Sequence, residues 1–382
     1  MKNWKKISGI ILITIPLIFA CKRQNNGTDG FEVSPLEGGK SMQINKYTGE
    51  EKTVIIPPQI NGLPVTHIGD EAFAQMELIE VTIPGSVTHI GDGAFLRNQL
   101  TSINIPNSVT HIGKGAFSEN QLIDLVIPGS ITYIEQDTFS WNQLTGVTIP
   151  GSVSIIENNV FHGNQLTSVT IPDSVIYIGP DAFASNQLTN VIIPDSVQYL
   201  SGFRANQIAS VTIPGSVTHI GAYAFGENQL SNINIPSSVA HIEPDAFAKN
   251  QLTSISIPDG VISLSGFRAN QLTSVIIPDS VTYIGGFAFN ENQLTSVTIG
   301  NNVAFIGHFA FTDNRLSTIT IPDSVSEISR SAFSDNRLTG ITIGGDVSIF
   351  RDGGGFDMQF IQHYEELGRR AGTYSLRNGV WN

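Results

Sequence analysis

One stretch of 22 residues decides the fold, and it reads Leu166-Thr-Ser-Val-Thr-Ile-Pro-Asp-Ser-Val-Ile-Tyr-Ile-Gly-Pro-Asp-Ala-Phe-Ala-Ser-Asn-Gln187. In its first half, Val169 and Ile171 alternate with polar residues, a period of two that is typical of a half-buried strand. Pro172 has no backbone N–H to donate, so it ends the hydrogen bonding of that strand. The stretch therefore opens with a short strand that stops at a turn.

The second half of the stretch returns the chain to the core. Val175 and Ile178 mark another extended or turn-like segment. Residues 179–181, Gly-Pro-Asp, change the chain direction, and Ala182 and Phe183 follow as the next apolar pair. We expect this pair to lie in a 3-10 or single helical turn and to face inward.

The stretch is one unit of a long internal repeat. The isoleucine that precedes the turn recurs at Ile83, Ile105, Ile127, Ile149, Ile171, Ile193, Ile213, Ile235, Ile257, Ile277, Ile299, Ile321 and Ile343. Successive positions are 22 residues apart, except for two steps of 20 that contain the same string, Ser-Gly-Phe-Arg-Ala-Asn-Gln, at 201–207 and 265–271. The strings lie 64 residues apart, which indicates that a block of three units was duplicated. Growth by whole units is typical of a solenoid in which each turn contacts its neighbours.

Two columns of identical residues agree with stacked turns. Phenylalanine occupies one position in every unit from Phe73 to Phe333, which predicts a spine of buried rings. Asparagine occupies another from Asn98 to Asn336. A carboxamide offers both donor and acceptor, so stacked Asn side chains can satisfy backbone groups that a tight turn leaves without partners. We interpret the Asn column as structural, since its members lack the Asn-x-Ser/Thr pattern of glycan attachment.

The repeated pattern Leu-x-x-Val-x-Ile-Pro…Val-x-x-Ile…Ala-Phe…Asn resembles the BspA-like class of bacterial leucine-rich-repeat surface proteins. The resemblance covers roughly residues 31–350, although many members have Cys near the Asn column and this chain does not. It implies a leucine-rich-repeat solenoid with a parallel β-sheet on one face and short strands or 3-10 turns on the other. The residues of the C-terminal segment themselves predict an α+β cap, as argued below. The resemblance also implies a cell-surface protein that binds host matrix proteins or other bacteria. We expect about 13 turns, with the Leu-x-x-Val-x-Ile segments forming the sheet.

Composition excludes several classes of protein. With 40% hydrophobic residues the chain can form a real core, so disorder throughout is excluded. The net charge of −13 argues against nucleic-acid binding, which needs clustered Lys and Arg. One cysteine excludes an intrachain disulfide framework and a Cys-rich metal site.

The N-terminus has the pattern of a secretory signal. Lys2, Lys5 and Lys6 precede an apolar run over residues 7–20, which is too short for a comfortable membrane span. Residues 18–21, Ile-Phe-Ala-Cys, resemble the lipobox of bacterial lipoproteins, which implies a signal peptide over residues 1–20 and lipidation of Cys21. We expect the membrane to be reached only through that lipid, in the bacterial cell envelope and on its outer surface. The alternative is a cleaved signal that leaves an incidental free thiol.

The two ends of the array are expected to differ from its turns. Residues 21–30 are mostly polar and predict a flexible tether. Residues 351–382 predict a cap, because Phe356, Phe360, Ile361, Tyr364 and Leu367 mark one face of a short helix and residues 371–381 read as a hairpin. A separate functional module is the alternative for this segment.

We do not expect an enzyme or a cofactor. No Ser/His/Asp grouping, phosphate-binding loop or nucleotide fingerprint occurs. Five histidines share one repeat position, just before the Ile of Val-x-x-Ile, where other units have mostly aromatic residues. His67, His89 and His111 could share a metal there, but no Asp or Glu of this column lies beside them, so we expect a stacking surface and no metal site.

The expected ligand is an extracellular-matrix or cell-surface protein. Outward positions of the Leu-x-x-Val-x-Ile segments are small, uncharged and hydrogen-bonding, and they supply no deep pocket. The candidates on this face are Thr167, Ser168, Thr170, Ser210, Thr212, Ser254 and Ser296. The competing face is the His/Tyr column, represented by Tyr177 and Tyr199.

Two other readings of the surface stay open. One is a coat or spacer protein without a specific ligand. The other is an enzyme, or a surface that templates ice or glycan through its Thr columns, which Val126, Ile192 and Ile276 interrupt.

Overall fold

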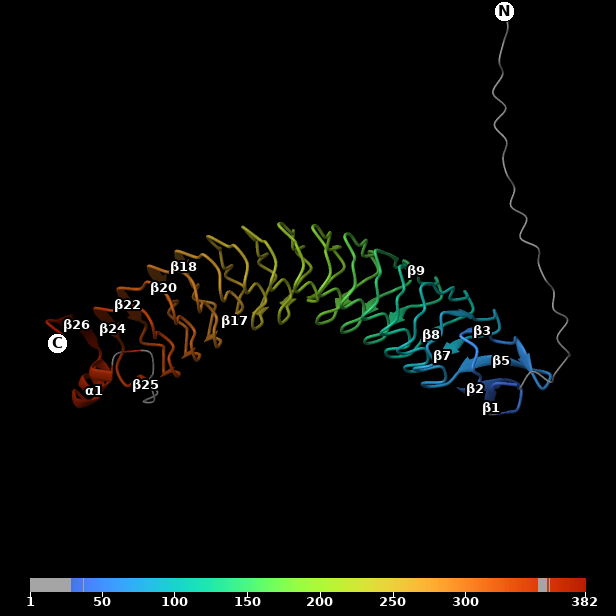
Figure 1. Ribbon diagram of the computed structural model, residues 1–382. Coiled ribbons are helices and arrows are strands. Elements are labelled where there is room, and N and C mark those ends of the chain that lie inside the picture. Colours follow the sequence, from blue (N-terminus) through green and yellow to red (C-terminus); the bar gives the residue numbers. More distant parts are fainter. Residues whose placement is uncertain (1–28, 37, 350–355, 357) are drawn as a thin grey trace, which may run out of the picture.

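The computed structural model describes residues 29–36, 38–349, 356 and 358–382. The chain winds into one elongated solenoid of about 14 turns that bends into an arc (Figure 1). This confirms the predicted leucine-rich-repeat solenoid. The predicted signal peptide, Cys21 and most of the predicted tether lie outside the described residues.

A long parallel ladder follows the inner edge of the arc, where Figure 1 labels β7, β8, β17 and β25. Each turn contributes two residues, of which the second is the buried apolar residue of the Val-x-x-Ile segment. Eleven strands pair in sequence as one sheet: β10 (Tyr133–Ile134), β12 (Ile155–Ile156), β13 (Tyr177–Ile178), β14 (Tyr199–Leu200), β15 (His219–Ile220), β16 (His241–Ile242), β17 (Ser263–Leu264), β19 (Tyr283–Ile284), β21 (Phe305–Ile306), β23 (Glu327–Ile328) and β25 (Ser348–Ile349). Strands β7 (His89–Ile90) and β8 (His111–Ile112) belong to the sheet at the N-terminal end.

The outer edge of the arc has only short ladders, although the Leu-x-x-Val-x-Ile segments run along it (Figure 1). They pair as β3 (Thr53–Ile55) with β6 (Glu80–Thr82), β9 (Asp124–Val126) with β11 (Gly146–Thr148), β18 (Ser274–Ile276) with β20 (Ser296–Thr298), and β22 (Thr318–Ile321) with β24 (Gly340–Ile343). Between these pairs the described residues add one isolated bridge, Thr170 with Ile192.

The expectation that the Leu-x-x-Val-x-Ile segments form the long sheet is therefore wrong, because the Val-x-x-Ile segments form it. The curvature supplies the reason. Turns that touch along the inner edge of an arc diverge along its outer edge, and a backbone hydrogen bond weakens steeply as donor and acceptor separate. The outer strands keep their alternation of buried and exposed residues but lose much of their pairing.

The predicted phenylalanine spine runs through the core. Rings in successive turns from Phe73 to Phe333 stack with centroids 5.1 to 6.0 Å apart, and their exposure is at most 1%. The stack continues at both ends of the array. At the N-terminal end the Tyr47 ring lies 5.5 Å from Phe73, and at the C-terminal end the Phe356 ring lies 5.1 Å from Phe333. Burial of each ring contributes roughly 1.5–3 kcal/mol.

The asparagine column bonds one turn to the next. Asn186 Nδ2 donates to the carbonyl oxygens of Phe161, at 2.9 Å, and Phe183, at 3.0 Å, while its Oδ1 accepts from the N–H of Leu166 at 2.9 Å. The same three contacts recur along the column, for example at Asn250. The structural interpretation of this column is confirmed.

Each end of the array is closed by elements outside the repeat. At the N-terminal end, β1 (Phe31–Pro35) pairs antiparallel with β2 (Met42–Tyr47), which runs parallel to β5 (Leu63–Ile68), and β4 (Gln59–Ile60) pairs with β5. At the C-terminal end, α1 (Met358–Glu366) buries Phe360, Ile361 and Tyr364. The hairpin of β26 (Gly372–Arg377) and β27 (Val380–Trp381) follows, with β26 antiparallel to β24. The predicted helix and hairpin are confirmed, but Phe356 and Leu367, which were expected on the helix, lie outside it.

Candidate binding surfaces

All seven outer candidates are exposed, and they extend over several turns of the outer edge: Thr167, Ser168, Thr170, Ser210, Thr212, Ser254 and Ser296. Their side chains alternate with buried or half-buried Val and Ile, as the period of two predicts. The exposed positions also include single large apolar residues, Ile192 at 78% and Ile276 at 70%. The outer face is thus a mixed surface of hydroxyl groups with isolated aliphatic side chains.

Two open hollows interrupt this outer face. One has a volume of about 550 Å³ and brings Ser210 and Thr212 beside Ile192. The other has a volume of about 1020 Å³ and includes Ser254 and Ile276. The remaining outer candidates do not line either hollow.

Both hollows lie where a 20-residue unit follows a longer one. In an ordinary turn, a serine hydroxyl donates to a carbonyl of the preceding turn, as Ser174 does to Val153 at 2.6 Å. Ser216 and Ser280 follow the two short units, and their buried hydroxyl groups have no hydrogen-bond partner. Sequence reasoning missed the hollows, although the two steps of 20 residues were the signal.

The inner edge presents the predicted His/Tyr column. Tyr177 and Tyr199, in β13 and β14, are half-buried and stack with centroids 5.0 Å apart. The stack continues along the ladder, with ring centroids 6.5 Å apart between Tyr199 and His219 and 4.7 Å apart between His219 and His241. Because parallel strands in register place equivalent side chains side by side, the rings face one another and turn their edges to solvent.

Burial and acidic neighbours raise the pKa values of the tyrosines in β10, β13 and β14. Burial, then Glu243 and the adjacent Tyr177, raises the pKa of Tyr199 to about 12. Tyr133 donates its phenolic O–H to Glu157 Oε1 at 2.6 Å, and burial together with this contact raises the pKa of Tyr133 as well. Since tyrosine is neutral at physiological pH even at its ordinary pKa of about 10, the raised values only extend that range to higher pH.

The histidines at the N-terminal end stack instead of converging on a metal. His67 and His89 lie 4.2 Å apart with an interplanar angle of 5°, and His111 continues the stack at 5.9 Å. Burial, and after it the neighbouring histidine, lowers the pKa of both His67 and His89. Among the residues that the structure describes, no group of three or more His, Cys, Asp or Glu could hold a metal ion.

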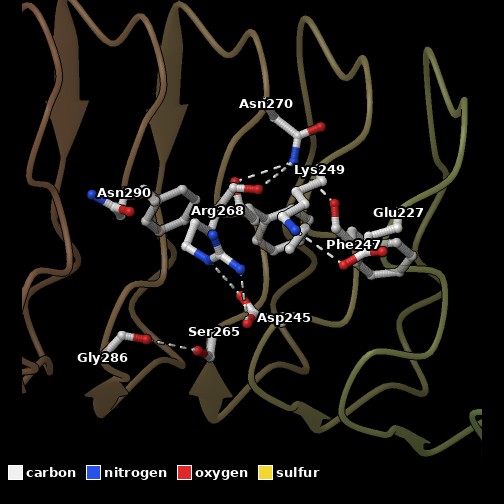
Figure 2. Close-up of polar contacts among 12 residues, drawn as sticks. Glu227, Asp245, Phe247, Lys249, Ser265, Arg268, Asn270, Gly286 and Asn290 are labelled. Carbon is white, nitrogen blue, oxygen red and sulfur yellow. Dashed lines mark hydrogen bonds and ion pairs between the residues drawn. The ribbon is translucent and has the colours of Figure 1, made fainter. Parts of the chain in front are cut away.

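Each of the two short units forms the same kind of ion pair with the turn before it, and Figure 2 shows one of them. Arg268 reaches Asp245 of the preceding turn through Nε at 3.0 Å and Nη2 at 3.3 Å, and Arg204 reaches Asp181 in the same way. The Arg204 guanidinium also lies 5.8 Å from the centre of the Tyr223 ring. Sequence reasoning noted the shared string but missed this pairing, which fixes the shorter turn to the longer one before it.

A surface cluster of aromatic side chains forms where two adjacent turns meet near the C-terminal half of the arc. Phe287, His308 and Phe309 contact one another, and we call them the aromatic cluster. Tyr283 and Phe305 of the inner column form a separate stacked pair. Tyr283 stacks on Phe305 at 5.0 Å, and Phe287 stacks on Phe309 at the same separation. His308 contacts the edge of Phe287 at 5.1 Å.

Sequence reasoning missed this cluster. It placed Tyr283 and Phe305 in the inner column but missed Phe287, His308 and Phe309. The sequence did contain a sign of them. One corner position holds glycine, asparagine or aspartate in most turns but phenylalanine in two successive turns.

The family is shown by comparison with known repeats. The profile of the BspA type leucine rich repeat region, six copies long, matches residues 52–167, 154–266 and 260–353. The chain belongs to this family. Membership in the BspA-type repeat family indicates a protein-binding role at a bacterial surface, and the leucine-rich-repeat solenoid is typically a binding scaffold without catalytic activity.

Solved structures give the same fold. A leucine rich cell surface protein from Faecalibacterium prausnitzii is 25% identical, with a TM-score of 0.53 over 84% of this chain and 96% of its own. A leucine-rich repeat protein from Bacteroides ovatus is also 25% identical, with a TM-score of 0.57 over 83% of this chain and 90% of its own. The pneumococcal vaccine antigen PcpA, 21% identical, has a TM-score of 0.59 over 86% and 89% and shows the fold alone.

None of the curated proteins matches the sequence. In the part of the chain that the structure describes, no helix has the length and apolar character needed to cross a bilayer.

Proposed function

We propose that this protein is a lipid-anchored adhesin of the bacterial cell surface, which binds matrix proteins or proteins of other cells through its repeat surface. The observation that supports it most is the inner ladder, which places aromatic and hydroxyl side chains in register along the concave edge of a BspA-type solenoid. Tyrosine side chains are enriched among the residues that dominate protein interfaces.

We favour the inner column over the outer Thr/Ser positions as the binding face. The outer face has exposed hydroxyls but few large side chains, and those are isolated from one another. The inner face has Tyr177, Tyr199 and Tyr283 held by stacking against neighbouring turns. Rigid rings lose little conformational entropy on binding, so each contact retains more of its free energy.

A pull-down tests the proposal. The chain from residue 22 onward, tagged at its C-terminus, is expected to retain at least one protein from a panel of matrix and serum proteins. The matched control is a BspA-type solenoid of the same length whose inner Tyr and His positions are all Ser. If neither retains a protein from the panel or from intact neighbouring cells, the adhesin proposal is wrong and an inert surface coat or spacer replaces it.

Lipid anchoring is proposed separately, because Cys21 lies outside the described residues. It is supported by the basic residues, the apolar run and the Ile-Phe-Ala-Cys segment at 18–21. Expression of the full chain followed by detergent partitioning is expected to place it in the detergent phase, and Cys21→Ala is expected to move it to the aqueous phase. If the Cys21→Ala protein remains in the detergent phase, the anchor is not this cysteine.

A further inference from the structure

The two hollows of the outer edge occupy equivalent places in the duplicated block of three units. Ten of the eleven residues that line the smaller hollow have their counterpart, 64 residues later, in the lining of the larger one. These pairs include Asn190 with Ser254, Asp195 with Asp259, and Ser210 with Ser274. The hollows are therefore a repeated feature of the chain, at the same place relative to each 20-residue unit.

Beside each hollow, a hydrogen bond between successive turns is missing. In eight of the described turns, a serine hydroxyl at this corner donates to a carbonyl oxygen of the preceding turn, as Ser196 does to Val175 at 2.6 Å. Ser216 and Ser280 hold the same corner in the turns that follow the short units, and their buried hydroxyl groups have no partner. Because a buried hydroxyl without a partner is unfavourable, both places favour a ligand or water that forms hydrogen bonds.

The polar lining of the hollows consists of hydroxyl, amide and carboxylate groups. Among the described residues that line them, none is Lys, Arg or His. Asp195 in the smaller hollow and Asp259 in the larger one are exposed, and a carboxylate accepts hydrogen bonds. Since uncompensated negative charge repels an anion, the lining favours a ligand that has many hydrogen-bond donors and no negative charge.

Each hollow also has one strongly exposed isoleucine, Ile192 at the smaller and Ile276 at the larger. A sugar ring has hydroxyl groups around its rim and an apolar C–H face, so it matches polar groups that lie beside an aliphatic side chain. A protein partner fits less well. Among the described residues, no Trp, Tyr or Arg lines either hollow, and these side chains dominate protein interfaces.

The two hollows lie in line on one edge of a single array. Strands β18 and β20, whose residues line the larger hollow, run along the outer edge of the arc in Figure 1. The smaller hollow lies three turns nearer the N-terminus, a separation of at least about 14 Å at ~4.8 Å per turn. An extended ligand that follows this edge therefore meets both hollows.

We propose that the two hollows are equivalent subsites for one neutral linear polysaccharide. Sugar hydroxyls donate to Asp195 and Asp259, and a sugar ring lies against Ile192 in one hollow and Ile276 in the other. Two subsites hold one polymer more tightly than either does alone, because the second contact forms within the same complex. This site is separate from the inner column and does not depend on the proposed protein-binding role.

The test uses the chain from residue 22 onward and native gels that contain soluble linear β-glucan, mannan or galactan. Retardation of the protein at increasing polysaccharide concentration gives the dissociation constant, and a sulfated polysaccharide is the control ligand. The variant Ser210→Leu with Ser274→Leu replaces an exposed hydroxyl in each hollow by a larger aliphatic group. The matched control, Ser102→Leu with Ser168→Leu, makes the same change at the same repeat position in turns that line neither hollow.

A second variant closes the hollows by lengthening the short units. It replaces residues 201–207 and 265–271 by the sequence of residues 179–187, Gly-Pro-Asp-Ala-Phe-Ala-Ser-Asn-Gln, so that both units become 22 residues long. Ser216 and Ser280 should then donate to the preceding turn as Ser174 does. Circular dichroism checks that the lengthened chain is folded.

We expect wild type to bind at least one of the three neutral polysaccharides and not the sulfated one. The double Leu variant and the lengthened chain should each bind at least tenfold more weakly, and the control variant should stay within twofold of wild type. Ser210→Leu alone or Ser274→Leu alone should weaken binding at least threefold, because the polymer is then held at one hollow.

Four results would overturn the inference. They are no binding of any neutral polysaccharide by wild type, equal binding by wild type and the double Leu variant, equal weakening in the control variant, and tighter binding of the sulfated polysaccharide. Full binding by both single variants would contradict one polymer spanning both hollows. Tyr177→Lys with Tyr199→Lys should leave polysaccharide binding unchanged, and its loss there would place the site on the inner column instead.

Discussion

At the scale of single residues, the spine of phenylalanine rings is a continuous part of the core, beside the buried Val, Ile and Leu residues. Phe203 is fully buried and stacks on Phe183 at 5.3 Å and on Phe225 at 5.4 Å. Phe203→Ala should remove those contacts, leave a cavity and cost about 3–5 kcal/mol locally. Hydrogen exchange of the flanking turns measures this cost, and Thr212→Ala, an exposed change on the outer edge, is the control. Similar exchange rates in both variants would mean that the spine is not the core.

The stacked histidines predict a pH dependence at the N-terminal turns. The pKa values of His67 and His89 are lowered, so the folded protein binds their protons less readily than the unfolded chain. Their contribution to stability is complete above about pH 6.5, the value in an unfolded chain, and is lost as pH falls below it. His67→Tyr with His89→Tyr should reduce the loss of thermal stability between pH 8 and pH 5. A loss as large as in wild type would show that these histidines do not contribute to it.

Some residues of the core could be predicted from the sequence, whereas the surface rings could not. The Phe and Asn columns were predictable because each repeats in every turn and each type has one chemical reason to be there, burial or hydrogen bonding. Phe287, His308 and Phe309 depart from the repeat at single turns, so a pattern built on what units share passes over them. Their contacts depend on rings from two turns meeting, which periodicity does not specify.

At the scale of elements, two strands of the same unit behave differently. The Val-x-x-Ile segments pair along the inner edge, while the Leu-x-x-Val-x-Ile segments pair only in places. Alternation predicted the strands correctly but could not predict which would lie inside the arc. Curvature is a property of stacked turns, since it accumulates from small rotations between neighbours.

The C-terminal cap is expected to be held by one ring. Phe360 is fully buried and lies 5.2 Å from both Phe356 and Trp381. Phe360→Ala should loosen α1 and the hairpin, since the ring joins the helix to the last strand. Hydrogen exchange in β26 and β24 should rise by at least tenfold, whereas Met358→Ala, at a residue that is 56% exposed, should change it little. Unchanged exchange in the Phe360→Ala protein would mean that the cap is held elsewhere.

At the scale of the whole molecule, the solenoid should tolerate removal of whole turns. Deletion of residues 203–266 joins Gly202 to Phe267 and reproduces the string Ser-Gly-Phe-Arg-Ala-Asn-Gln without a change. Because each turn contacts only its neighbours, the shortened chain should remain folded. Circular dichroism and small-angle scattering check this, with a deletion of half a unit as the control. An unfolded or aggregated product from the seamless deletion would contradict a one-dimensional array.

The measurement that tests the central claim most directly compares charge substitutions on the two edges of the arc. Thr170→Lys with Thr212→Lys alters the outer edge, and Tyr177→Lys with Tyr199→Lys alters the inner edge. Binding of each folded variant to the matrix or cell-surface protein that wild type retains is measured by surface plasmon resonance. The account predicts at least tenfold weaker binding for the inner pair and unchanged binding for the outer pair. Loss of binding only with the outer pair would contradict it.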